Sequence, residues 1–270
     1  SFVGNFRSPS AGRDTWVDFI VPTIKDNIMF LQLINVGRSF GGLQAVNAVD
    51  LTVEKGEILG LMGANGAGKT TLFNLIAGNL KPTTGEIWLE GKRTDGLRAD
   101  QLNRMGVGRA FQIVRPFSGL TVLENVVIGC LFGRGHEQSI TKAQNIAKEI
   151  LDQVGIVDRA DDKAGTLTLV GRKKLEIARS LATQPSLLLL DEVMAGLTPV
   201  EVSEALETVS KLHREQGLTI IVIEHVMRAL MYLSERLVVL HHGSKIAEGT
   251  PKEISESEVV NEAYFGDPKE

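Results

Sequence analysis

One segment of eight residues limits the fold of this chain more than any other part of its sequence. Residues 63–70 read Gly-Ala-Asn-Gly-Ala-Gly-Lys-Thr and satisfy the pattern G-x-x-x-x-G-K-[ST] in full. The segment follows a predicted strand over 58–62 and opens a predicted helix over 69–77. A strand, a glycine loop and a helix in this order form a phosphate-binding loop, because the loop N–H groups and the helix N-terminus both favour an anion. The chain is therefore expected to bind a nucleoside triphosphate.

The residue types in and after this loop indicate a role for each position. The residues expected to surround the phosphates are Gly63, Asn65, Gly66, Ala67, Gly68, Lys69, Thr70 and Thr71. Lys69 would reach the β- and γ-phosphates as a catalytic residue, and the Thr70 hydroxyl would hold one position of a Mg²⁺ ion. The alternative is a glycine turn that precedes a helix by chance. The spacing, the flanking elements and the Lys-Thr ending together argue against it.

Two acids follow a run of apolar residues in the second half of the chain. Residues 187–190 are four leucines, which predict a strand buried on both faces, and Asp191 and Glu192 come directly after them. At the carboxyl end of a parallel strand, such acids face the nucleotide crevice. Asp191 is expected to hold Mg²⁺, and Glu192 to polarise the water that attacks the γ-phosphate. A helix cap or a solvated strand end is the alternative that the phosphate-binding loop disfavours.

A histidine ends the next predicted strand, over 220–223. His225 could donate a hydrogen bond to the γ-phosphate or orient the attacking water. A lone histidine is more often structural. Its place one strand after the two acids favours a catalytic role.

Strands and helices alternate along most of the chain, which predicts an α/β fold with a largely parallel sheet. The predicted strands are 30–36, 45–53, 57–62, 86–90, 187–190, 220–223, 236–240 and 245–248. The predicted helices are 69–77, 122–131, 140–154, 172–183, 200–215 and 226–233. Residues 1–28 have no sustained period and are interpreted as an N-terminal extension of unknown role. Residues 29–270 are interpreted as one domain, with a mainly helical part at about 113–182.

Composition argues against several other classes of protein. The 270 residues include 29 Lys and Arg and 33 Asp and Glu, a net charge of −4, so no nucleic acid partner is expected. Cys130 is the single cysteine, which excludes an internal disulfide and fits a reducing compartment. Apolar runs stay short of the roughly 18 residues that a membrane-spanning helix needs.

The order of these segments resembles the ATP-binding subunit of ABC transporters over residues 29–270. Phe40, ahead of two glycines, resembles the aromatic residue that stacks on adenine in that family. Gln112, after Phe111, resembles the glutamine that contacts the metal and senses the membrane partner, and His225 resembles the switch histidine. The resemblance implies ATP and Mg²⁺ as cofactors. It also implies an ABC-type P-loop NTPase domain with a mainly parallel sheet core, an antiparallel β subdomain and a helical subdomain.

The family's signature, commonly Leu-Ser-Gly-Gly-Gln, corresponds here to Leu-Thr-Leu-Val-Gly at 167–171. The resemblance implies a head-to-tail dimer in which the Thr168 hydroxyl contacts the γ-phosphate held by the other subunit, with Gly171 in the place of the glutamine. Val170 replaces the second glycine and would obstruct a close approach if that position required φ > 0. A second departure is Thr198, which replaces the usual aspartate of the D-loop.

Within the family, the chain is most similar to the importer ATPases for branched-chain amino acids. The segments that carry this likeness are 40–43, 175–179 and 195–199. It implies an enzyme that hydrolyses ATP to drive import through membrane permease subunits. The chain would lie peripherally at the cytoplasmic face of the plasma membrane and act indirectly with a substrate-binding protein. Importers of urea or other small amides share these features, and a homodimer and a heterodimer fit equally well.

Residues 111–117 form the candidate edge for docking a permease, with an ordinary solvated loop as the alternative.

Two functions other than transport are also considered. A soluble ABC ATPase of DNA repair or ribosomes would be expected to carry a coiled-coil insertion or a second phosphate-binding loop, and the sequence has neither. A binding module that barely hydrolyses would fit the altered signature, but it would need neither Glu192 nor His225.

Overall fold

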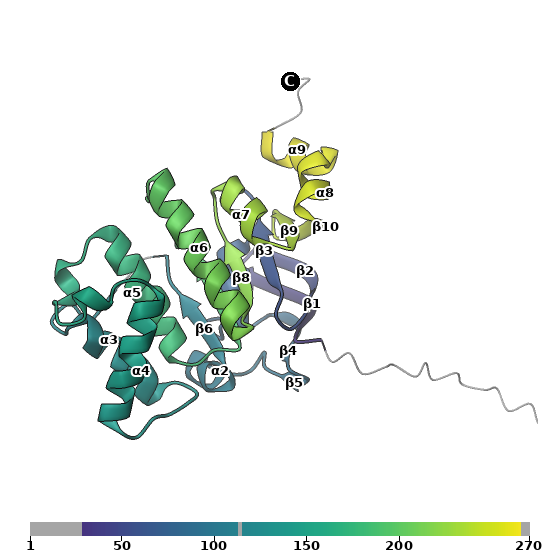
Figure 1. Cartoon of the computed structure of the whole chain (residues 1–270). Coiled ribbons are helices and arrows are strands. Elements are labelled where there is room, and N and C mark those ends of the chain that lie inside the picture. The colour runs from purple at the N-terminus through teal and green to yellow at the C-terminus, as the bar shows by residue number, and fades with distance from the viewer. Residues whose placement is uncertain (1–28, 113–114, 266–270) are drawn as a thin grey trace, which may run out of the picture.

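The computed structural model describes residues 29–112 and 115–265, so the predicted extension over 1–28 lies outside the described residues (Figure 1). The described part contains a four-stranded sheet of order β2-β1-β4-β5 and a six-stranded sheet of order β10-β9-β3-β8-β7-β6. The helices α3, α4 and α5 lie together on one side of the second sheet (Figure 1). The expected division into a parallel core, an antiparallel sheet and a helical part is confirmed.

The smaller sheet is antiparallel. It consists of β1 (Leu31–Phe40), β2 (Leu43–Val53), β4 (Thr84–Leu89) and β5 (Lys92–Arg93). Strand β1 pairs antiparallel with both β2 and β4. Since β1 and β2 are joined by the two glycines at 41–42, Phe40 lies at the turn of this hairpin.

The larger sheet is parallel except at one edge. It consists of β3 (Ile58–Met62), β6 (Val107–Ala110), β7 (Leu187–Asp191), β8 (Thr219–Ile223), β9 (Arg236–His241) and β10 (Ser244–Gly249). Within the larger sheet of the described residues, β10 alone runs antiparallel to its neighbour, with which it forms a hairpin at His242-Gly243. Because β6, β7, β8 and β3 run parallel, the residues that follow them gather at one edge of the sheet.

The helices cover these sheets and extend beyond them. They are α1 (Lys69–Ile76), α2 (Ala99–Met105), α3 (Val122–Phe132), α4 (Ile140–Gln153), α5 (Leu169–Ala182), α6 (Pro199–Gln216), α7 (Met227–Leu233), α8 (Pro251–Glu256) and α9 (Glu258–Phe265). The short 3-10 turns are η1 (Val157–Arg159) and η2 (Ala164–Thr166). In the part of the chain that the structure describes, no helix has the length and apolarity that a bilayer span requires.

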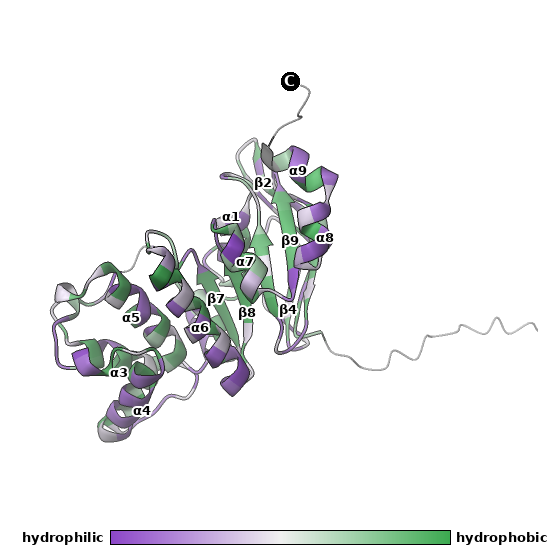
Figure 2. Cartoon of the chain, turned by 45° about the horizontal axis from the view of Figure 1, so that its top comes forward, coloured by the Kyte–Doolittle hydropathy of each residue, from purple (hydrophilic) through white to green (hydrophobic). Residues whose placement is uncertain are grey.

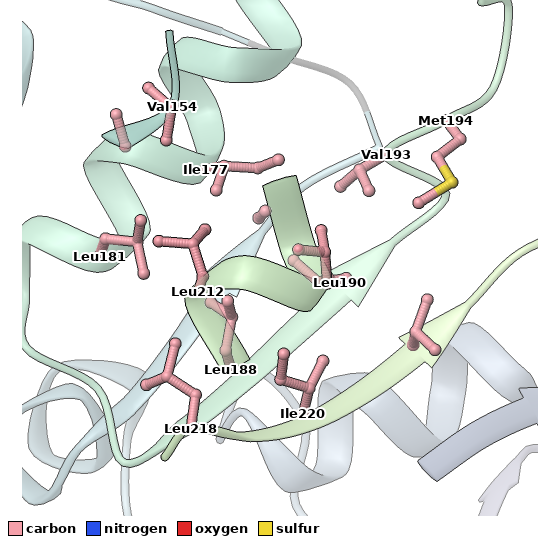
Figure 3. Close-up of a cluster of buried hydrophobic side chains, with 14 of the residues drawn as sticks. Val154, Ile177, Leu181, Leu188, Leu190, Val193, Met194, Leu212, Leu218 and Ile220 are labelled. Atoms are coloured by element: carbon pink, nitrogen blue, oxygen red, sulfur yellow. The ribbon is translucent and has the colours of Figure 1, made fainter. Parts of the chain in front are cut away.

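Apolar side chains on both faces hold the large sheet in place. Its strands are strongly hydrophobic, whereas α6 is hydrophilic on much of its surface (Figure 2). Figure 3 shows Leu188 and Leu190 of β7 beside Leu212 of α6, and Ile177 and Leu181 of α5 at the rim of the same cluster. Helix α5 therefore attaches the helical part to the sheet by hydrophobic burial.

The structure adds elements that the sequence did not predict. Strand β6 reads Val-Gly-Arg-Ala, too short and mixed to give a period of two, and α2 spans seven residues. Helix α5 begins at Leu169 rather than at 172, because the Thr168 hydroxyl accepts a hydrogen bond of 3.2 Å from the N–H of Gly171. A threonine at the N-cap favours a helix start at this point.

Candidate nucleotide-binding and catalytic site

The phosphate-binding loop connects β3 to α1 as expected. Gly68, at the N-cap of α1, has φ of 102°, and a Cβ there would lie 2.5 Å from the carbonyl oxygen of Ala45. Only glycine fits this combination of left-handed backbone and close approach. The loop therefore packs closely against β2 at Gly68.

Lys69 turns back into this loop. Its ammonium group donates hydrogen bonds to the carbonyls of Gly63 at 2.6 Å and Ala64 at 3.0 Å. Burial lowers the pKa of Lys69, while the nearby carboxylates of Glu192 and Asp191 oppose that shift. The Lys69 ammonium group is thus bound to two main-chain carbonyls, which an anionic phosphate would replace as its partners.

A pocket of about 360 Å³ lies over the loop. Its lining consists of Phe40, Leu43, Ala45, Asn65, Gly66, Ala67, Gly68, Lys69, Thr70, Thr71 and Glu192. Gly63 contributes a carbonyl to the loop but does not line this pocket. Phe40 is 44% exposed, and the Arg38 guanidinium lies 4.6 Å from its ring centroid. An exposed ring at the edge of a phosphate pocket is suited to stacking on a base.

The three residues predicted to contact a metal line a second pocket of about 480 Å³. Thr70, Gln112 and Asp191 contribute to it from the ends of the loop, β6 and β7. The Asp191 oxygen Oδ1 is buried and has no hydrogen-bond partner among the described residues. A hydroxyl, an amide oxygen and a carboxylate are ligands that Mg²⁺ prefers. The unpartnered Oδ1 could accept a hydrogen bond from a water bound to the Mg²⁺ ion. The residues therefore fit a Mg²⁺ ion.

Two of the predicted catalytic side chains, those of His225 and Gln112, contact the carboxylate of a third, Glu192. His225 Nε2 lies 2.6 Å from Glu192 Oε1, and the Gln112 amide donates to Glu192 Oε2. Glu192 has φ of 49°, a left-handed conformation that costs about 1–3 kcal/mol for a residue other than glycine. Neighbouring structure must hold this backbone in place.

Lys173, which the sequence analysis missed, holds it. From α5, its buried ammonium group donates to the main-chain carbonyls of Glu192 at 3.0 Å and Gln112 at 3.3 Å. Burial lowers the pKa of Lys173, and Glu224 is the first of the acids that oppose the shift. Its spacing from Leu169 and Ile177 was the available signal, because a lysine on the apolar face of a helix must find a polar partner.

Glu224 is a second missed residue. Its carboxylate is buried, Oε1 accepts a hydrogen bond of 2.8 Å from the N–H of Met194, and burial raises the pKa to about 7. Glu224 lies directly before His225 and fixes the chain that follows Glu192. No local sequence signal indicates this burial, since it depends on contacts between β7 and β8.

The two signature residues lie at the start of α5 and line neither of these pockets. Thr168 caps the helix, and Gly171 is buried against Leu167. Val170 has the right-handed backbone of α5, so the obstruction expected for a left-handed residue does not arise. Thr198 caps α6, accepting from the N–H of Glu201 at 3.4 Å. Threonine and aspartate are both good N-caps, which explains that substitution locally.

The family model described as ABC transporter matches residues 46–195. The high-affinity branched-chain amino acid transport ATP-binding protein LivG of Escherichia coli strain K12 is 40% identical over 240 residues, covering 84% of this chain and 94% of LivG. The protein BraF of Pseudomonas aeruginosa, which has the same description, is 37% identical over 249 residues, covering 88% of this chain and 98% of BraF.

Solved structures agree in fold. The ADP conformation of MJ1267, an ATP-binding cassette of an ABC transporter, has a TM-score of 0.80 and 31% identity, covering 89% of this chain and all of that one. The dimeric post-hydrolysis state of the cassette MJ0796, bound to ADP and Pi, has a TM-score of 0.74 and 28% identity, covering 82% of this chain and 98% of that one. The chain belongs to the ABC transporter family, and it is an ATPase with that family's cassette fold.

Proposed function

We propose that this chain is one of two ATPase subunits that drive the import of branched-chain amino acids through membrane permeases. The observation that carries the ATPase part is the Glu192 carboxylate, which His225 and Gln112 contact beside the phosphate-binding loop. The likeness to LivG and BraF, whose names give their cargo, supports the choice of substrate. A cytoplasmic, peripheral position at the membrane and an indirect action with a substrate-binding protein belong to the same proposal.

The site residues would divide the chemistry as follows. A Mg²⁺ ion bound with the nucleotide supplies positive charge to the β- and γ-phosphates. Lys69 would leave the loop carbonyls and contact those phosphates. Glu192 would take a proton from the attacking water, and His225 and Gln112 would orient that carboxylate and the γ-phosphate. Thr70, Gln112 and Asp191 would hold the metal through their oxygens or through its waters.

A second subunit would complete the site. The N-terminus of α5, with Thr168 and Gly171, lines neither pocket beside this chain's own phosphate-binding loop, and its positive end would face a partner. The MJ0796 dimer supports a pair of cassettes. ATP would favour the closed pair by binding it more tightly than the open one.

The helical part of 113–182 is proposed to face the permease. Phe111 is 44% exposed and Phe117 is 48% exposed, while the Arg179 guanidinium lies 5.3 Å from the Phe117 ring centroid. Residues 113 and 114 of the predicted docking edge lie outside the described residues. Exposed aromatic rings beside an arginine are typical of a protein interface.

The test of the ATPase pair is turnover per subunit measured against protein concentration with Mg²⁺, with Glu192→Gln as the blank. Turnover should rise with concentration if two copies complete the site. Equal turnover by the blank would overturn the proposed site. The cargo is tested in proteoliposomes that hold the chain and its permeases, with the substrate-binding protein added. ATP-dependent uptake of labelled leucine that excess valine inhibits supports the proposal, whereas uptake of urea alone contradicts it.

A further inference from the structure

Arg109 lies buried beside the candidate metal site and was not singled out by the sequence. It occupies the third position of β6, and its side chain is 8% exposed. One guanidinium nitrogen, Nη2, lies 2.6 Å from Asp191 Oδ2, and the other, Nη1, donates to Asn74 Oδ1 at 2.7 Å. Arg109 therefore joins the ends of two strands to α1, the helix that follows the phosphate-binding loop.

Aromatic packing limits the movement of this guanidinium group. It lies 4.8 Å from the ring centroid of Phe111 and 5.9 Å from that of Phe73. Phe73 is fully buried in α1, and Phe111 directly precedes Gln112. Because the guanidinium is planar and its donors form a fixed fork, packing on its faces sets the direction of both hydrogen bonds.

The two oxygens of Asp191 have different surroundings. Arg109 holds Oδ2, whereas Oδ1 is buried without a hydrogen-bond partner among the described residues. The carboxylate lines the same pocket as Thr70 and Gln112. Because a carboxylate is rigid and planar, the contact that orients Oδ2 also orients Oδ1. Hydrogen-bond partners of a metal-ligating carboxylate support a metal site in this way.

We propose that Arg109 is a positioning residue for the Mg²⁺ site. It fixes Asp191 so that Oδ1 accepts from a metal-bound water, and through Asn74 it keeps that carboxylate in register with the phosphate-binding loop. The inference rests on the proposed nucleotide site. The opposite role, in which the guanidinium takes the place of the metal, would make Mg²⁺ binding tighter when Arg109 is removed.

The experiment measures ADP affinity by calorimetry with Mg²⁺ and with EDTA, for the wild type and for Arg109→Gln, Arg109→Lys and Asn74→Ala. The quantity compared is the affinity for ADP with Mg²⁺ divided by the affinity for ADP with EDTA. Arg109→Gln should lower this ratio about tenfold, the usual loss for a partner of a metal ligand. Lysine should not restore the ratio, since one ammonium group cannot make both directed contacts. Arg214→Gln, an exposed change on α6, should leave the ratio unchanged.

Asn74→Ala keeps the Arg109–Asp191 ion pair and tests the inference even where loss of the buried guanidinium prevents folding. It should lower the ratio in the same direction by a smaller factor. An unchanged or raised ratio in folded Arg109→Gln, or an unchanged ratio in Asn74→Ala where Arg109→Gln does not fold, would overturn the positioning role alone. A wild type that binds no ADP would overturn the proposed function, and this inference with it.

Discussion

The ammonium group of Lys173 donates a hydrogen bond of 3.0 Å to the main-chain carbonyl of Glu192, and so joins α5 to the proposed catalytic carboxylate. Glu192 needs such support because its backbone is left-handed. The same ammonium group contacts the carbonyl of Gln112. One side chain from the helical part thus fixes the main chain at two of the proposed catalytic residues.

Replacing Lys173 by methionine should therefore reduce both stability and turnover. The buried carbonyl of Glu192 would keep only the hydrogen bond from the N–H of Ala195 at 3.2 Å, and the carbonyl of Gln112 would lose its contact with the ammonium group. The free energy of unfolding should therefore fall by about 1–3 kcal/mol. ATP turnover should fall on the order of tenfold or more, because Glu192 is no longer held in position. Denaturant unfolding and phosphate release provide the measurements. Lys174→Met, at the less buried neighbouring position, is the control, and equal effects of both substitutions would contradict a specific role for Lys173.

Glu192→Gln should bind ATP and fail to hydrolyse it. Glutamine keeps the size of the side chain but cannot accept the proton of the attacking water, so turnover should fall by at least about 100-fold. With ATP and without turnover, a dimer should accumulate, which light scattering after size-exclusion chromatography would detect. A variant that hydrolyses at the parental rate would remove Glu192 from its proposed role.

Lys69→Ala should weaken ATP binding about 10- to 100-fold, since a charge-assisted hydrogen bond contributes about 1.5–3 kcal/mol. The measurement is a titration with a fluorescent ATP analogue. Lys92→Ala, an exposed change on β5, serves as the matched loss of charge. Unchanged affinity in Lys69→Ala would show that the phosphates bind elsewhere.

Glu224 should make stability depend on pH. Burial raises the pKa of Glu224 to about 7, above its ordinary value of 4.5. Between those values the folded chain holds a proton that the unfolded chain has lost, so this group's contribution to stability falls as pH rises from 4.5 and levels off above 7. Glu224→Gln should therefore be more stable than the wild type at pH 8, by about 1–3 kcal/mol, and similar to it near pH 4.5.

Urea unfolding of both proteins at pH 4.5 and pH 8 would measure this difference. Glutamine keeps an oxygen that can accept from the N–H of Met194, so the comparison isolates the charge. Glu207→Gln, an exposed change on α6, is the control. A difference between Glu224→Gln and the wild type that stays constant with pH would contradict the assigned shift.

The sequence predictions of secondary structure that the structure confirmed depend on patterns within short segments of the chain. The glycine loop before Lys69 and the apolar runs that form β7 and β8 are each determined within a few residues, because backbone freedom and burial on both faces leave clear compositional signals. Because these strands pair in parallel, the residues at their carboxyl ends lie at the same edge of the sheet. Those residues are Asp191, Glu192 and His225. Most of the lining of the candidate nucleotide pocket could therefore be predicted.

The supporting residues were not predictable in the same way. Arg109 lies in a four-residue strand, and Asp191, with which its side chain forms an ion pair, is 82 positions away. Glu224 is buried by the pairing of β7 with β8. Such contacts depend on tertiary packing, which a single sequence does not display. Lys173 and the N-cap Thr168 left weak local signals, and the predicted start of α5 was wrong by three residues because that cap was overlooked.

Helix α5 has a consequence for how two nucleotide sites would act in time. It begins at the signature, which is proposed to face the nucleotide of a second subunit, and Lys173 at its second turn bonds to the main chain beside this subunit's own Glu192. A displacement of α5 relative to the sheet would therefore change the position of Lys173 against those carbonyls. In the proposed pair, capture of ATP by one subunit and readiness for hydrolysis in the other would therefore be coupled through this one helix.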